Sequence, residues 1–151
     1  MTVIFFALTL AGKISDAAPA GYLPIDLAGM EKFIAESHGK MIVVNFFASW
    51  CPPCREEIPG LIALRKFFPE NKLALIGVSV DEDMNALKNY AQKARFNYPI
   101  RMAMPDLLRG ARISSIPHLC IFDKQGKLLV NIAGIVPEKV LRDFLREHLE
   151  K

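Results

Sequence analysis

Apolar and polar residues form blocks along the chain that predict strands and helices in turn. Two continuous apolar runs, at 41–47 and 73–80, have the length and the lack of alternation typical of strands buried on both faces of a sheet. Elsewhere apolar residues recur three or four positions apart, with polar residues between them, which predicts helices. These helices are expected at 27–38, 53–68, 82–95, 105–112 and 137–150.

Turn and capping residues mark the boundaries of these elements. Gly39 is placed to end the first helix, and Asp81 or Asp83 to cap the third. Pro59 falls inside the second helix and should kink it, because proline removes one backbone hydrogen bond. A turn at 124–126 separates two short apolar segments and predicts an antiparallel hairpin.

The order of the elements predicts an α/β fold. A helix, strand, helix, strand and helix come first, followed by the hairpin strands at 119–123 and 128–132 and a final helix. A βαβ unit joined to a ββα unit gives a mixed sheet with helices on both faces, in three α/β/α layers. A short extended segment at 98–102 brings the expected number of strands to four or five.

Composition describes one ordered domain. The chain has 151 residues, of which 52% are hydrophobic and 23% are charged, enough for a full core but too few for two typical domains. The net charge is only +3, and Lys and Arg are scattered without a basic block or an interleaved aromatic stripe. Nucleic acid is therefore not an expected partner.

The first twenty residues differ from the rest. Residues 3–12 are apolar and 13–20 are small and polar, a pattern that resembles an export signal with a cleavage site near Ala20. No Lys or Arg precedes the run, so an N-terminal strand is the alternative. We expect a signal-like or N-terminal segment at 1–20, a domain at 22–151, and a periplasmic or otherwise exported location. The alternative location is the cytoplasm, because a catalytic cysteine pair functions in either compartment.

Cys51 and Cys54 are the candidate catalytic residues. They follow the predicted strand at 41–47 and open the helix at 53–68, the context typical of a thiol–disulfide redox site. Cys51 falls at the helix N-terminus, where unpaired N–H groups and the helix dipole favour a thiolate. Cys54 lies one turn further on, close enough to form a disulfide with Cys51. One thiol would attack a substrate and the other would resolve the product.

Metal binding is the competing interpretation of this pair. A structural zinc site needs four ligands. The remaining candidate ligands show no ligand spacing: Cys120, His38, His118 and His148. The pair could also hold Cu(I) or Zn(II) in a metallochaperone, with His118 as a third ligand. The redox interpretation is preferred, and no metal or organic cofactor is expected beyond the Cys51–Cys54 disulfide itself.

Three segments and the closing helix resemble the thioredoxin superfamily, and more narrowly its exported TlpA/ResA/CcmG-like thiol–disulfide oxidoreductases. The segments are VVNFFASWCPPCREEIPGL at 43–61, IGVSVDED at 76–83 and SSIPHLCIFDKQGKL at 114–128. Tryparedoxins also carry WCPPC, so a cytosolic tryparedoxin- or thioredoxin-like reductant is the alternative.

The resemblance implies a thioredoxin fold, protein thiol or disulfide substrates, and a membrane-linked thiol donor. The candidate substrates it implies are apocytochrome c during cytochrome c maturation, a copper-site assembly protein and misoxidised exported proteins. The chain shows no extra dimerisation segment, which favours a monomer.

The resemblance also assigns roles to residues outside the cysteine pair. Ile116-Pro117 corresponds to the cis-proline that faces the cysteines, where a partner chain could bind like an added strand. Glu57 matches a glutamate that could exchange protons with the thiols; the alternative is a solvated side chain like that of Glu56. Asn45 replaces the buried acid of classical thioredoxins, which makes a role for Glu57 more plausible.

The residues around the cysteines complete the expected substrate site, made of Trp50, Pro52, Pro53, Ile116 and Pro117. Trp50 offers a flat apolar contact surface. Pro52 and Pro53 lack an N–H, which limits thiolate stabilisation and favours a reductant or moderate-potential exchanger.

Two residues beyond the predicted cis-proline have simpler interpretations. His118 stands where this branch commonly has a threonine, and is expected to fill a strand position, or else to tune the site. Cys120 is expected to be a small buried hydrophobe.

Overall fold

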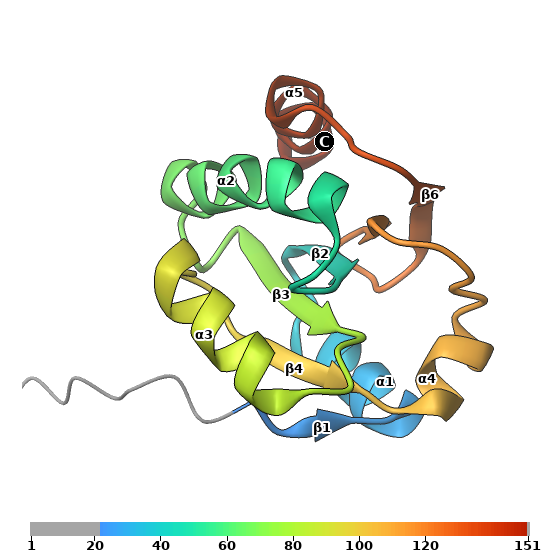
Figure 1. Cartoon of the computed structure of the whole chain (residues 1–151). Helices are drawn as coiled ribbons and strands as arrows, with labels where there is room; N and C mark the ends of the chain where they lie inside the picture. The colour runs from blue at the N-terminus through green and yellow to red at the C-terminus, as the bar shows by residue number, and fades with distance from the viewer. Residues whose placement is uncertain (1–21, 151) are drawn as a thin grey trace, which may run out of the picture.

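A mixed sheet of six strands forms the centre of the molecule in the computed structural model, which describes residues 22–150 (Figure 1). The expected segment at 1–20 lies outside these residues. The strands lie in the order β1-β4-β3-β2-β5-β6. Their bounds are β1 Pro24–Ile25, β2 Met41–Phe47, β3 Leu73–Ser79, β4 Ile100–Ala103, β5 His118–Phe122 and β6 Leu128–Ala133. The first four in sequence pair in parallel, while β5 is antiparallel to β2 and β6 to β5.

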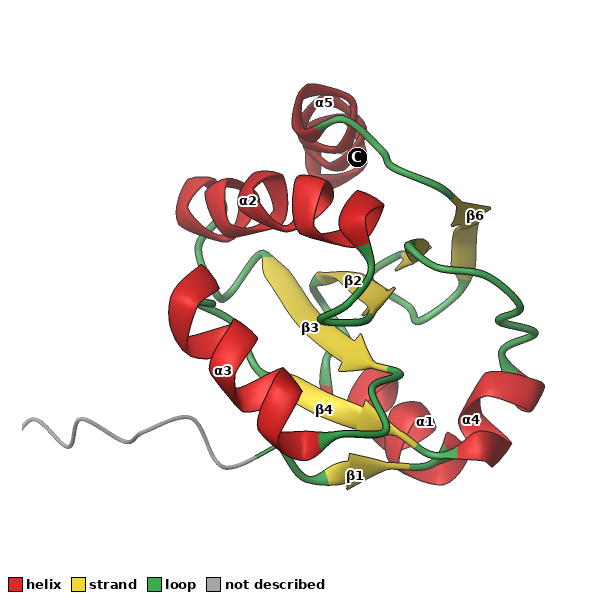
Figure 2. Ribbon diagram, in the orientation of Figure 1, coloured by secondary structure: helices red, strands yellow, loops and turns green. Residues whose placement is uncertain are grey.

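Helices cover both faces of this sheet (Figure 2). Their bounds are α1 Leu27–Glu36, α2 Pro52–Phe67, α3 Met84–Ala94, α4 Pro105–Gly110 and α5 Glu138–Glu150. Buried side chains of α2, α3 and α5 pack on one face, and those of α1 and α4 on the other. The predicted α/β/α layers are confirmed.

The predicted number of strands was wrong. The sheet has a sixth strand, β1, in which Pro24 and Ile25 pair with Met102 and Ala103 of β4. Two residues are too few to show either strand or helix periodicity, so the segment has no sequence pattern of its own. It forms because β4 offers an open parallel edge.

The ends of the helices depend on their caps. Asp83 Oδ1 accepts a hydrogen bond from Asn85 N at 2.8 Å, so α3 begins at Met84 and Asp83, not Asp81, is its cap. Helix α1 ends at Glu36, two residues before the predicted bound, and the chain turns at Gly39 with φ of 90°. Pro59 lies inside α2, which continues through it.

Candidate active site

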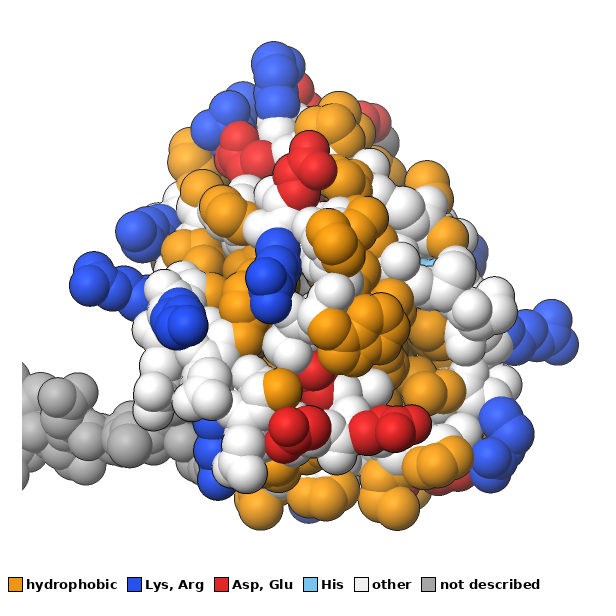
Figure 3. All heavy atoms as spheres, viewed as in Figure 1, with side chains coloured by type: hydrophobic (Ala, Val, Ile, Leu, Met, Phe, Trp, Pro, Cys, Tyr) orange, Lys and Arg blue, Asp and Glu red, His pale blue; other side chains and the backbone are white. Residues whose placement is uncertain are grey.

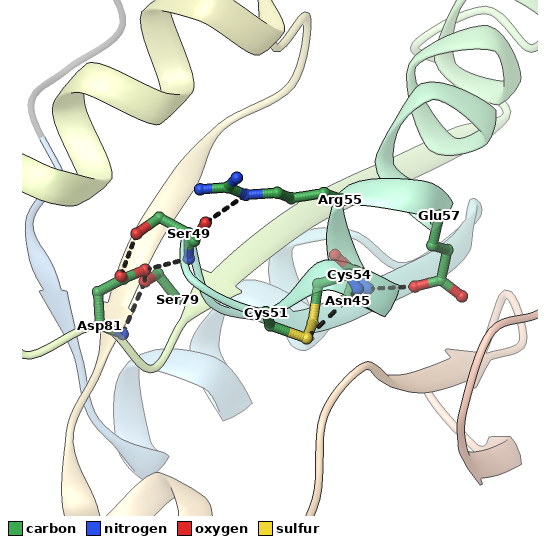
Figure 4. The surroundings of a disulfide bond; sticks show 8 residues. All are labelled: Asn45, Ser49, Cys51, Cys54, Arg55, Glu57, Ser79 and Asp81. Atoms are coloured by element: carbon green, nitrogen blue, oxygen red, sulfur yellow. Dashed lines mark hydrogen bonds between the residues drawn. A yellow bond between two sulfur atoms is a disulfide. The ribbon is translucent and has the colours of Figure 1, made fainter.

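The two cysteines of the predicted redox pair are joined as a disulfide where β2 passes into α2 (Figure 4). Cys51 is the N-cap residue of α2, and its Sγ accepts a hydrogen bond from Cys54 N at 3.3 Å. Cys51 retains 4% exposure whereas Cys54 is fully buried. A partner therefore reaches Cys51 first, and the same backbone donor that contacts its sulfur would stabilise a thiolate there.

Apolar residues surround the disulfide on its solvent side. Trp50 is 63% exposed, and Pro52 and Pro53 are also exposed. The Ile116–Pro117 peptide bond is cis, as predicted, and Ile116 packs against the core cluster that contains both cysteines. The expected substrate-site residues are thus brought together at one end of the sheet.

A hydrophobic area lies at the centre of this face of the molecule, with Asp and Glu side chains below it (Figure 3). Figure 3 shows hydrophobic side chains gathered over the region where β2 passes into α2, whereas most Lys and Arg side chains in this view lie toward the outline of the molecule. Such a surface suits contact with an apolar stretch of another chain.

Glu57 is buried, unlike its exposed neighbour Glu56. Its Oε2 accepts a hydrogen bond from Asn45 Nδ2 and its Oε1 one from Val136 N, both at 2.9 Å. Burial raises the pKa of the Glu57 carboxyl above 4.5, while the hydrogen bonds from Val136 and Asn45 act in the opposite direction. The interpretation of Glu57 as a solvated helix residue is therefore wrong.

Asn45 links this carboxylate to the disulfide region. It lies on β2, fully buried, and in the view of Figure 4 its amide is between the disulfide and Glu57. Its Oδ1 is buried without a hydrogen-bond partner. An acceptor left free beside a cysteine pair is available to a thiol S–H once the disulfide is reduced.

A second polar cluster was missed by the sequence analysis. The carboxylate of Asp81, buried at the end of β3, accepts hydrogen bonds from Ser49 and Ser79, and Arg55 binds the other side of Ser49 (Figure 4). Only the Ser-x-Asp spacing at 79–81 hints at this cluster, because its main partner is 32 residues away.

His118 and Cys120 lie on β5 with their side chains among the residues that face α1 and α4. Both residues are buried, and His118 Nε2 is hydrogen-bonded to Asn131 Oδ1. Burial raises the pKa of the Cys120 thiol to about 11, which makes it a poor nucleophile at neutral pH. The structure agrees with a packing role for Cys120.

Residues 22–150 hold neither a metal-binding cluster nor a membrane-spanning helix. Among them, no three His, Cys, Asp or Glu residues come together as a group that could hold a metal ion, so His118 does not join the cysteine pair in such a group. In the same part of the chain no helix combines the length and the apolar character needed to cross a bilayer.

Comparison with known proteins places this geometry in a family. Residues 14–130 match the AhpC/TSA family. The chain is 26% identical over 144 residues to the thiol-disulfide oxidoreductase ResA of a Bacillus cereus strain, covering 95% of this chain and 83% of that protein. It is also 26% identical over 147 residues to ResA of Geobacillus thermodenitrificans, covering 97% and 82%.

A solved structure confirms the fold. The crystal structure of a thiol:disulfide interchange protein of the thioredoxin family from Chlorobium tepidum TLS superimposes with a TM-score of 0.71 at 32% identity, over 76% of this chain and 83% of that one. The expected thioredoxin fold is thereby confirmed. The chain belongs to the AhpC/TSA family and is a thiol–disulfide oxidoreductase of the thioredoxin superfamily.

Proposed function

We propose that this protein reduces disulfides in exported proteins, with Cys51 as the nucleophile. The observation that carries the proposal is the position of Cys51 at the N-cap of α2, slightly exposed and next to the exposed Trp50. The Cys51 thiolate attacks one sulfur of a substrate disulfide; that S–S bond breaks, a mixed disulfide forms, and the second substrate sulfur leaves as a thiolate.

Cys54 resolves this intermediate. Its thiolate attacks Cys51 Sγ, which breaks the mixed disulfide and forms the Cys51–Cys54 bond. Two electrons pass from the enzyme dithiol to the substrate, whose two sulfurs take up protons. The burial of Cys54 supports this order, because a fully buried sulfur meets Cys51 more readily than a partner.

Glu57 supplies and accepts protons for Cys54 in this scheme. Burial raises the pKa of its carboxyl, which makes the protonated form more accessible than it is in a solvated glutamate. The Asn45 amide is hydrogen-bonded to Glu57, and its free Oδ1 can accept a hydrogen bond from the Cys54 thiol and so orient that thiol.

The two prolines support the reductive direction of the reaction. Pro52 and Pro53 are the first residues of α2 and have no N–H to offer the Cys51 sulfur. A less stabilised thiolate makes the reduced form a better electron donor. A membrane-linked thiol donor would then restore the dithiol after each cycle.

The signal-like pattern at 3–20 supports an exported, periplasmic location. The similarity to ResA supports proteins with thiols or disulfides as the substrates. Within that class we propose apocytochrome c as one substrate. We propose that the enzyme acts as a monomer.

Covalent trapping tests this function. The Cys54→Ser variant, expressed in the native host, should accumulate mixed disulfides on Cys51 that a reductant releases, because no resolving thiol remains. The Cys51→Ser variant is the matched control and should trap nothing, as Cys54 is buried. Adducts on Cys51→Ser alone, or none on either variant, would overturn the assignment; apocytochrome c among the trapped proteins would identify the substrate.

A further inference from the structure

Asp81 lies at the carboxyl end of β3, and its carboxylate holds the loop in front of Cys51. Its Oδ2 accepts hydrogen bonds from Ser49 N at 2.8 Å and from Ser79 Oγ at 2.6 Å. Its Oδ1 accepts a hydrogen bond from Ser49 Oγ at 2.5 Å. Asp81 is only 6% exposed, so these bonds form in a region of low dielectric, where charge-assisted bonds are strong.

Ser49 is also held from its other side. Arg55 Nε donates to Ser49 O at 2.5 Å, and the Arg55 guanidinium lies over the Tyr90 ring at 5.1 Å. The N–H, hydroxyl and carbonyl of Ser49 are therefore all bonded, to β3 through Asp81 and to α2 through Arg55 (Figure 4). The residue two positions before Cys51 has little freedom to move.

The hydrogen bonds of Ser49 determine how the next two residues, Trp50 and Cys51, are oriented. Trp50 projects into solvent, so its orientation depends on the backbone on either side of it. Cys51 N donates to Ala48 O at 3.2 Å, which closes the loop around the fixed Ser49. A loop ordered before a partner arrives loses less conformational entropy on binding. It also keeps the attacking sulfur in a productive direction.

We propose that Asp81 is a positioning residue for thiol–disulfide exchange: through Ser49 it sets the pose of the Trp50 surface and of the Cys51 sulfur. The inference rests on the proposed function, in which Cys51 is the nucleophile. Asp81 touches neither the sulfur nor a substrate in this scheme and acts through Ser49.

Two effects of Asp81 on the pKa of Cys51 have opposite signs, which makes the proposal testable. A carboxylate charge near a thiol raises the thiol pKa, so loss of the charge alone would lower it. Loss of the loop pose would weaken the N-cap contact between Cys51 Sγ and Cys54 N, which raises the pKa.

The experiment compares Asp81→Asn, Ser49→Ala and Asp83→Asn with the wild type. Ser49→Ala removes the hydroxyl bond but keeps the Asp81 charge and the backbone bond, so it disturbs the buried cluster less than Asp81→Asn does. Asp83→Asn removes the same charge from an exposed residue whose side chain bonds Asn85 N. The substrates are a peptide with a disulfide-linked Cys-x-x-Cys pair and oxidised glutathione; the Cys51 pKa is followed by ultraviolet thiolate absorbance.

We expect Asp81→Asn and Ser49→Ala to lower kcat/KM for the peptide about tenfold, mainly through KM, and to raise the pKa of Cys51. The rate with oxidised glutathione, which needs little of the Trp50 surface, should fall less. Asp83→Asn should match the wild type. An unchanged kcat/KM for Ser49→Ala, a lowered Cys51 pKa in Asp81→Asn, or an equal effect of Asp83→Asn would overturn the inference. A wild type inactive on both substrates would instead refute the proposed function.

Discussion

At the scale of single residues, the site depends on polar groups that are buried and bonded to distant parts of the chain. Glu57 binds Val136, 79 positions away, and Asn45 on the neighbouring strand. Burial raises the pKa of Glu57, so the charged form is disfavoured in the folded protein relative to the unfolded chain. The stability of the fold and the protonation of this carboxyl are therefore linked.

The sign of that linkage gives a prediction. Because the folded pKa lies above the unfolded value of 4.5, the contribution of Glu57 to stability is full below pH 4.5 and is lost as pH rises through the folded pKa. Glu57→Gln removes this titration and can keep both bonds if the Asn45 amide rotates. Urea unfolding across pH should show wild type losing stability relative to Glu57→Gln as pH rises.

The matched control is Glu56→Gln, because Glu56 is exposed on the same helix. Its unfolding free energy should run parallel to that of the wild type at every pH. If the difference between wild type and Glu57→Gln did not vary with pH, the raised pKa would be refuted.

In exchange assays Glu57→Gln should slow reduction of a protein disulfide by about 10²-fold if the carboxyl is the proton donor.

At the scale of elements, the contact between α2 and α5 places the loop that binds Glu57. A Cβ added to Gly60 of α2 would lie 3.0 Å from Glu138 Cβ at the start of α5. Since a Cβ is fixed to its backbone, the first turn of α5 would have to move to relieve the contact. The glycine thus permits a close approach of two helices that a larger residue would prevent.

We therefore predict that Gly60→Ala destabilises the protein by about 1 kcal/mol. Alanine normally gains about 1 kcal/mol over glycine inside a helix, but overpacking costs about 1–3 kcal/mol. The Ala63→Gly variant of the same helix measures the propensity difference without the contact. Thermal unfolding measures the stability change of each variant. A Gly60→Ala variant more stable than the wild type would show that the start of α5 can shift at little cost.

At the scale of the whole molecule, one sheet divides the core into two parts that share its strands. Leu145 of α5 packs on one face with Leu61 and Leu119, and Leu107 of α4 packs on the other with Val44 and Val78. Leu145 and Leu107 are both fully buried. Because β2 and β3 each contribute side chains to both faces, loss of either part exposes the shared sheet.

Leu145→Ala and Leu107→Ala should each cost about 2–5 kcal/mol, a large part of the roughly 5–15 kcal/mol typical of a whole domain. Their effects should add within about 0.5 kcal/mol, because the two side chains share no neighbours across the sheet. Urea unfolding of both single variants and the double variant measures this. Leu128→Ala, at a residue 45% exposed, is the control and should change stability little.

Sequence pattern alone predicted the order of helices and strands and the cysteine pair at the start of α2, while the family resemblance predicted the cis-proline before β5. These features are local: strand and helix periodicities, and the chemistry of Cys-x-x-Cys at a helix start, are complete within a few residues. Strand β1 was not predicted, because a two-residue strand has no periodicity. The cap of α3 was left open, because either Asp81 or Asp83 could have capped the helix.

Tertiary structure alone decided what the buried polar groups do. Glu57 could have been solvated like Glu56, and became a buried acceptor only because the chain after β6 brings Val136 N to it. Asp81 became the anchor of Ser49 because β3 ends beside the loop that leaves β2. The physical reason is that a polar side chain is satisfied by whichever partner folding places within hydrogen-bond distance, and no local pattern records a partner that lies tens of residues away.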